Sequence, residues 1–306
     1  MSRAGISGVT SFVILLAAFA PGKPGQTDKK VAGIDWKQVD QALGKSGALQ
    51  PDGAYKVGLP RGDLRVTVGE VVVKPSLALG SWVAFKQVSD SQAMLMGDLV
   101  LLESEVGPVI GKLQERGIEQ TALHNHLQHE SPHIMYLHIV GRGDPVMLAA
   151  AVHSALTLTK TPFGTSATAA PAAPFGLDTA QIAQTLGYHG KVNGGVYQVG
   201  VARAESIAVD GIAIPPSMGL ATAINFQPTG KGKAAITGDF VLIGSEVNPV
   251  IRALRDNSIA VTAVHSHMLM DSPHLFFMHY WANDDAAKLA HGLRAALDKM
   301  NVKRAA

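Results

Sequence analysis

The 306-residue chain contains no cysteine. Disulfide bonds, thiolate metal ligands, a cysteine nucleophile and a lipid-modified cysteine after a signal segment are therefore excluded. Charged side chains make up only 16% of the residues, the net charge is +2, and Lys and Arg form no run longer than a pair. Because nucleic-acid binding requires clustered positive charge, we expect no nucleic-acid partner.

Long apolar runs are scarce as well. The longest, residues 6–20, follows a single arginine and ends in the small-residue pattern Ala18-Phe19-Ala20. Since a membrane helix needs about 20 apolar residues, this pattern favours a secretory signal peptide over residues 1–22. Pro21 directly after the best cleavage site leaves an uncleaved anchor as the alternative. We expect the rest of the chain to have no membrane span and to be secreted or periplasmic.

A tandem duplication organises the chain. Residues 97–138 align without a gap to residues 238–279, and 20 of the 42 positions are identical. The same offset of 141 relates Pro75-Ser76 to Pro216-Ser217. Each unit is long enough for a core of its own, so the sequence predicts two homologous domains rather than a solenoid.

The predicted domains are residues 35–160 and 178–303. Between them, residues 161–177 are rich in Ala, Pro and Thr without apolar periodicity, which is typical of a linker. Within each domain, alternating apolar and polar residues predict strands, and in the first domain the first of these covers residues 64–75. A 3.6-residue apolar period predicts two helices. The resulting order, β-β-β-α-β-β-α, indicates an α+β fold with a largely antiparallel sheet.

Histidines are concentrated in two equivalent segments, HNHLQHESPH (124–133) and HSHMLMDSPH (265–274). Side chains alternate along a strand, so His124 and His126 share one face. A hairpin turning near residue 131 would bring His138 opposite His124 and Glu130 to the same end. The predicted metal ligands are His124, His126, Glu130 and His138 in the first repeat, and His265, His267, Asp271 and His279 in the second.

Imidazole and carboxylate ligands suit a divalent metal. Zinc is the first candidate, and Mn, Fe, Ni and Cu accept the same ligand types. The competing interpretation is that these histidines form hydrogen bonds or a pH-sensitive patch without metal. We favour metal because both repeats retain the two histidines, the acid and the later histidine.

Other polar residues in the repeats have simpler interpretations. Glu105 and Glu246 lie near predicted helix starts, where a carboxylate is stabilised by free amide groups. The pairs Gly97-Asp98 and Gly238-Asp239 are interpreted as turns rather than as catalytic acids. Met268, Met270 and Met278 are expected to pack, although thioethers can bind copper.

The segments ALHNHL…ESPH…H, GGVYQV, LGSWVAF and FFMHYWANDDAAKLAHGLRAAL resemble the LppY/LpqO family of bacterial secreted proteins, a domain of unknown function. The resemblance covers nearly the whole chain after the signal segment, and the two His-x-His segments are its most specific marks. It implies export and a duplicated domain, and it implies no reaction.

Three functions are open at this point. The first is an exported protein that binds a divalent metal through the duplicated HxHx3(E/D) motifs, at two separate sites or one shared site. The second is a zinc-dependent hydrolase with a cell-wall or periplasmic substrate, in which the metal activates a bound water. The third is a metal-free module that binds a small molecule, carbohydrate or cell-wall ligand.

Overall fold

The structure is a computed structural model that describes residues 33–164 and 175–304. The predicted signal peptide lies outside the described residues, as does most of the predicted linker, residues 165–174. Within the described ranges, no helix has the length and apolarity needed to cross a membrane.

Each repeat contains a six-stranded antiparallel sheet. The strand orders are β1-β2-β5-β6-β9-β7 and β10-β11-β14-β15-β18-β16. The first sheet contains β1 (Ala48–Leu49), β2 (Tyr55–Pro60), β5 (Gly80–Gln87), β6 (Ala93–Leu102), β7 (Glu119–His124) and β9 (Ile134–Gly143). The second contains β10 (Lys191–Asn193), β11 (Val196–Ala202), β14 (Ala221–Gly230), β15 (Lys233–Ile243), β16 (Ala260–His265) and β18 (Leu275–Asp285).

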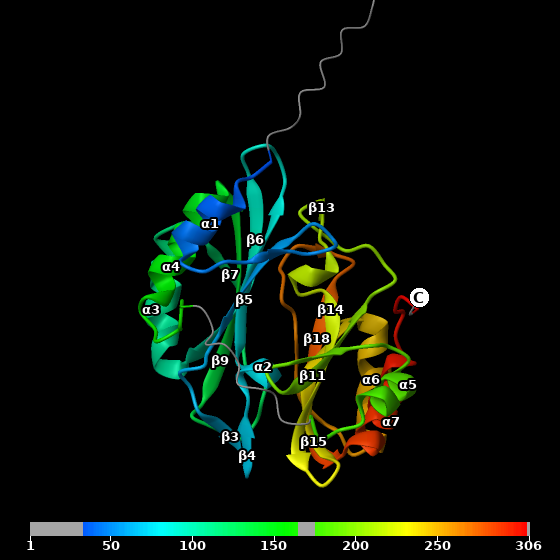
Figure 1. Cartoon of the computed structure of the whole chain (residues 1–306). Coiled ribbons are helices and arrows are strands. Elements are labelled where there is room, and N and C mark those ends of the chain that lie inside the picture. The colour runs from blue at the N-terminus through cyan, green and yellow to red at the C-terminus, as the bar shows by residue number, and fades with distance from the viewer. Residues whose placement is uncertain (1–32, 165–174, 305–306) are drawn as a thin grey trace, which may run out of the picture. The chain divides into compact units, whose positions relative to one another are not determined.

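Helices cover one face of each sheet (Figure 1). The first sheet carries α1 (Trp36–Leu43), α3 (Glu103–Gln114) and α4 (Pro145–Leu156), and the second carries α5 (Thr179–Leu186), α6 (Gly244–Asp256) and α7 (Ala286–Leu297). Short helices α2 (Pro75–Ala78) and η1 (Pro216–Met218) lead into β5 and β14. The predicted class, α+β with two homologous tandem domains of antiparallel sheet, is confirmed.

The order of elements is longer than the sequence predicts, because α1 and β2 precede the expected first strand. That strand, expected near residues 64–75, is a separate hairpin of β3 (Val66–Val68) and β4 (Val71–Val73). In each repeat such a hairpin pairs with a two-residue strand from the histidine loop. These three-stranded sheets have the orders β4-β3-β8 and β13-β12-β17, with β8 (Glu130–Ser131), β12 (Ala208–Val209), β13 (Ile212–Ala213) and β17 (Asp271–Ser272).

Strand alternation divides the side chains between two layers. On β6, Leu95 and Leu99 pack under the helices, whereas Met96 and Asp98 lie on the opposite face. That opposite face packs against the other repeat, because two of the apolar clusters combine residues of both repeats. Polar contacts join the repeats too: the Lys56 ammonium donates to the Ser217 carbonyl at 2.8 Å. The face opposite the helices is therefore where the two repeats can share a site.

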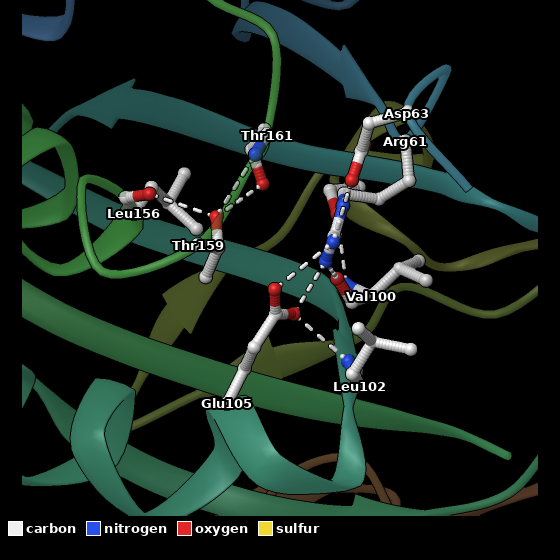
Figure 2. A network of polar contacts seen from close by, with 9 residues as sticks. Arg61, Asp63, Val100, Leu102, Glu105, Leu156, Thr159 and Thr161 are labelled. Carbon is white, nitrogen blue, oxygen red and sulfur yellow. Dashed lines mark hydrogen bonds and ion pairs between the residues drawn. The ribbon is translucent and has the colours of Figure 1, made fainter. Parts of the chain in front are cut away.

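The start of α3 is fixed by a buried ion pair, as Figure 2 shows. The Glu105 carboxylate accepts a hydrogen bond from the Leu102 amide at 2.9 Å and pairs with Arg61 at 2.7 Å. Glu246 does the same with the Ile243 amide and Arg203 in the second repeat. The predicted capping role of both glutamates is confirmed.

Two glycines that the sequence places in turns lie inside strands instead. Gly97 is within β6 and Gly238 within β15. A Cβ atom on Gly238 would lie 1.9 Å from the Ala223 carbonyl oxygen and 2.8 Å from the Tyr280 hydroxyl. Glycine inside a strand commonly marks such a close approach of backbone. The turn interpretation of Gly97-Asp98 and Gly238-Asp239 is wrong.

Replacing Gly238 with alanine is expected to lower the free energy of unfolding by about 1–3 kcal/mol, because β14 must move away to admit the methyl group. Gly200→Ala on β11 is the control, since a Cβ atom there meets nothing within 4 Å. The control should stay within about 0.5 kcal/mol of the parent. Urea unfolding measures both, and equal midpoints for Gly238→Ala and the parent would contradict the predicted clash.

Candidate metal centre

Six histidines, three from each repeat, gather where the repeats meet. Each imidazole lies against one from the other repeat, with ring centroids 3.6 Å apart in every pair. The pairs are His124 with His265, His126 with His279, and His138 with His267. The offset of 141 exchanges the last two pairs and maps His124 onto His265, so the cluster has approximate twofold symmetry.

The hairpin register differs from the prediction. His138 lies opposite Ala122, and His124 lies opposite Tyr136. The segment between β7 and β9 is no tight turn, because its strand β8 pairs with β3, and the register shifts between Gln120 and Ala122. The histidines still share one face of the sheet, but their nearest imidazole partners come from the other repeat.

The donor atoms form four overlapping groups, in each of which one atom per residue lies within 4.8 Å of the others. The groups are His124/His138/His265/His267, His124/His126/His279, Asp98/His126/His138 and Asp239/His267/His279. The first two contain histidines of both repeats, and the last two are equivalent sets within single repeats. All six predicted histidines are therefore brought together into one cluster rather than two.

The carboxylates in these groups are Asp98 and Asp239, which the sequence interpretation dismissed. Asp98 Oδ1 lies 3.8 Å from His138 Nε2, and Asp239 Oδ2 lies 3.8 Å from His267 Nε2. Asp98 is the direct cross-strand neighbour of His138 on β6 and β9. Alternation along β6 was the signal that could have found it.

Glu130 and Asp271, predicted as ligands, are absent from the four groups. Their carboxylates bond instead to His133 and His274, at 2.9 Å in each repeat. Each also accepts from the backbone amide four residues further along the chain. The acids of the HxHx3(E/D) motifs therefore hold the loop that follows the histidines, and Asp98 and Asp239 supply the carboxylates beside the imidazoles.

Buried polar atoms without a hydrogen-bond partner are confined to this region. In residues 33–164 and 175–304, every such side-chain nitrogen or oxygen belongs to the six histidines, to Asp98 and Asp239, or to Glu130. They include Nε2 of all six imidazoles. An unpaired buried polar atom costs about 1–3 kcal/mol, so this concentration indicates a place for a ligand.

Burial also sets the charge of the cluster. It lowers the pKa of His124 to about 4 and that of His265 to about 3. The pKa values of the other four histidines fall well below the usual range, mainly through burial and partly through the neighbouring imidazoles. All six are therefore neutral near pH 7, and each keeps one ring nitrogen with a free lone pair.

The two aspartates are shifted in the opposite direction. Burial raises the pKa of Asp98 to about 7, against the opposing effect of the nearby Lys56 ammonium. Burial, together with Asp98, raises the pKa of Asp239 well above its usual value. Carboxylates in this state can accept a proton near neutral pH, or be held as anions by a cation bound beside them.

A pocket opens onto one side of the cluster. His138 and His267 lie in its wall together with apolar side chains from both repeats, among them Met96, Met218 and Phe277. Two potential ligands therefore line this pocket.

Fold and cluster together define a tandem-repeat α+β protein whose two repeats share a buried set of histidines and aspartates. The family follows from comparison of sequences. The model of the family described as "Domain of Unknown Function (DUF1259)" matches residues 37–158 and 180–299, and the chain belongs to this family. The two matches correspond to the two repeats.

Two solved structures show a weak likeness. One is a trimeric bacterial microcompartment shell protein, PduB, with 12% identity over 83% of this chain and 90% of that chain, at a TM-score of 0.21. The other is EtuB from Clostridium kluyveri, with 10% identity over 83% and 91% and a TM-score of 0.20. No curated protein matches the chain.

Proposed function

We propose that this protein binds a divalent transition-metal ion, with zinc as the first candidate, through histidines of both repeats. The observation that carries the proposal is the set of unpartnered buried atoms, which includes Nε2 of all six imidazoles. The largest donor group, which we take as the main site, is His124, His138, His265 and His267.

A cation explains this arrangement better than hydrogen bonds within the cluster. A neutral imidazole has one N–H donor and one lone-pair acceptor. His279 already directs Nδ1 to the Gly238 carbonyl, at 2.9 Å, so its Nε2 faces the cluster as an acceptor. Converging lone pairs repel one another, and a metal ion between them turns that repulsion into coordination.

The donor set also limits the kind of metal. The four donor groups consist of imidazole nitrogens and carboxylate oxygens, which suit Zn, Mn, Fe, Ni or Cu. Tetrahedral zinc ligands at 2.0–2.1 Å from the ion lie roughly 3.4 Å apart. Donor atoms within 4.8 Å of one another reach that spacing by small side-chain rotations.

Hydrolysis is the second candidate. Asp98 and Asp239 border the histidines, and a carboxylate with a pKa raised to about 7, as at Asp98, suits a general base for a metal-bound water. The pocket beside His138 and His267 offers a substrate a route to the ion.

The proposed location outside the cytoplasm rests on the amino-acid sequence. The signal-like segment of residues 1–22 and the resemblance to the LppY/LpqO family support action outside the cytoplasm. In that setting a site without thiolates has the advantage that its ligands do not oxidise to disulfides.

The proposal is tested by elemental mass spectrometry of protein purified without chelator or histidine tag. The parent is expected to carry at least one equivalent of metal, and the His126→Ala/His267→Ala variant less than a tenth of that. This pair removes one ligand from each of the four donor groups. The control is His189→Ala/His291→Ala, which removes two exposed histidines outside the cluster.

Retention of metal by the control and its loss from the variant would support the site. If the parent is metal-free and takes up no added Zn, Mn, Ni or Cu, the metal proposal is wrong. The histidines would then be those of the metal-free binding module.

A further inference from the structure

The pocket beside the cluster is mainly apolar. Its wall includes Met96, Val140, Met218 and Phe277 together with His138 and His267. The cavity volume is about 80 Å³. One water molecule needs roughly 10–15 Å³ on the same measure, so a molecule of several heavy atoms fits.

The two histidines of the pocket wall carry unpartnered buried atoms. His138 is 5% exposed and His267 is 6% exposed, and Nε2 of each has no hydrogen-bond partner. Both belong to the main donor group. An ion held there would thus be within reach of a molecule that enters the pocket.

At the equivalent position in the other half of the molecule, hydrogen bonds join side chains of the two repeats to the backbone. There, the Gln128 side chain donates to the Thr262 carbonyl at 3.1 Å, and the Thr262 hydroxyl donates to the His126 carbonyl at 2.6 Å. Trp281 packs against the apolar cluster that contains Leu127 and Tyr136.

The residues of this pocket differ from their equivalents at the positions of Gln128 and Trp281. The offset of 141 places Leu269 at the position of Gln128, and Val140 at the position of Trp281. Leu269 cannot make the hydrogen bond that the Gln128 side chain makes, and Val140 occupies less space than the indole ring of Trp281. The two repeats have therefore diverged at positions that line this pocket.

The exposed side chains that line the pocket indicate which class of molecule it would bind. Leu269 and Met270 line it and are 65% and 67% exposed. The charged residues in its wall other than the histidines are Glu119 and Asp210, both acidic and exposed. Apolar side chains favour an apolar molecule, and the carboxylates disfavour an anion.

We infer that this pocket delivers a small, uncharged and mainly apolar molecule, bearing one lone-pair donor atom, to the metal ion at His138 and His267. The inference rests on the proposed function and adds the ligand class and the pocket through which the ligand reaches the ion. The donor atom would add a fifth ligand to an ion held by the four imidazoles, while the apolar body of the molecule packs against Met96, Met218 and Phe277.

The test uses the full protein loaded with Co²⁺, whose visible absorption changes when a ligand is added. The probes are pyrazole and 4-methylpyrazole, which are neutral, and azide, which is an anion. Both pyrazoles are expected to shift the spectrum, 4-methylpyrazole about fourfold more tightly because one more methyl group is buried. Azide is expected to bind at least tenfold more weakly than pyrazole.

Two variants introduce into the pocket the residues found at the equivalent positions of the other repeat. Val140→Trp is expected to weaken binding of 4-methylpyrazole at least tenfold, and Leu269→Gln to weaken it in the same direction, with cobalt content unchanged. Val192→Trp, which places an indole at an exposed position outside the pocket, should bind like the parent.

Equal affinity for the two pyrazoles, preferred binding of azide, or unchanged binding in both pocket variants would overturn the inference while leaving the metal site intact. Failure of the parent to take up Co²⁺ and the other divalent metals would instead overturn the proposed function itself. Cobalt content, measured in every variant, separates the two results and reports a variant that fails to fold.

Discussion

Replacing His138 and His267 together with alanine is expected to weaken metal binding little more than replacing either one alone. His138 belongs to the first repeat and His267 to the second, yet both are in the group with His124 and His265. Loss of either ligand is expected to reduce affinity at least about 100-fold, since even supporting contacts of ligands contribute 10–100-fold. Once one ligand is gone the ion is no longer held, so the second substitution has little left to remove.

A double-mutant cycle tests this prediction. The zinc affinity of each variant is measured by competition with a chromogenic zinc chelator. A shared site gives a coupling energy of about 2.7 kcal/mol, which corresponds to a 100-fold non-additivity. His138→Ala combined with His189→Ala is the control and should be additive, because His189 is exposed and outside the cluster. Additive effects of His138→Ala and His267→Ala would show that each repeat holds its ion alone.

The repeat, the α+β class and the two histidine segments could be predicted because each follows directly from a pattern in the sequence. A constant offset identifies the duplicated domain, and alternation places His124 and His126 on one face of a strand. The short loop strand β8 was missed because its two residues, Glu130 and Ser131, become a strand only through pairing with β3.

The sharing of the site between repeats could not be predicted from the sequence. It depends on how the two sheets pack, and the contacts that decide this, such as Lys56 with Ser217, join residues that are 161 positions apart. The prediction from one repeat alone therefore placed His138 opposite His124 of its own hairpin. In the structure its stacked imidazole neighbour is His267.

The aspartates were missed for a different reason. Gly-Asp pairs are typical of turns, since both residue types are frequent there. Here Gly238 is required because β14 approaches its backbone, and Asp239 then points from a continuous strand toward His267. The acid of the histidine motif was predicted as a ligand instead. In the structure, Glu130 contacts His133 and the Ile134 amide and so holds the loop.

Replacing Arg61 with methionine is expected to lower the free energy of unfolding by about 3–5 kcal/mol, the usual cost of removing one partner of a buried ion pair. Arg61 is fully buried, and its guanidinium uses all five N–H groups on the Val100 carbonyl and the carboxylates of Asp63 and Glu105 (Figure 2). Methionine preserves the apolar volume but leaves Glu105 and the Val100 carbonyl without their partner.

Urea unfolding measures the loss, and the duplication supplies a matched variant. Arg203 contacts the Val241 carbonyl, Glu205 and Glu246 in the same way, so Arg203→Met should cost a similar amount. The control is Lys112→Met, which removes an exposed ion pair with Glu115 and should change the value by less than about 1 kcal/mol. A loss at Arg61 no larger than at Lys112 would contradict the prediction. Because Val100 follows Asp98 by two residues on β6, the same ion pair anchors the strand that carries a carboxylate to the histidines, which connects the stability of each repeat to the geometry of the site.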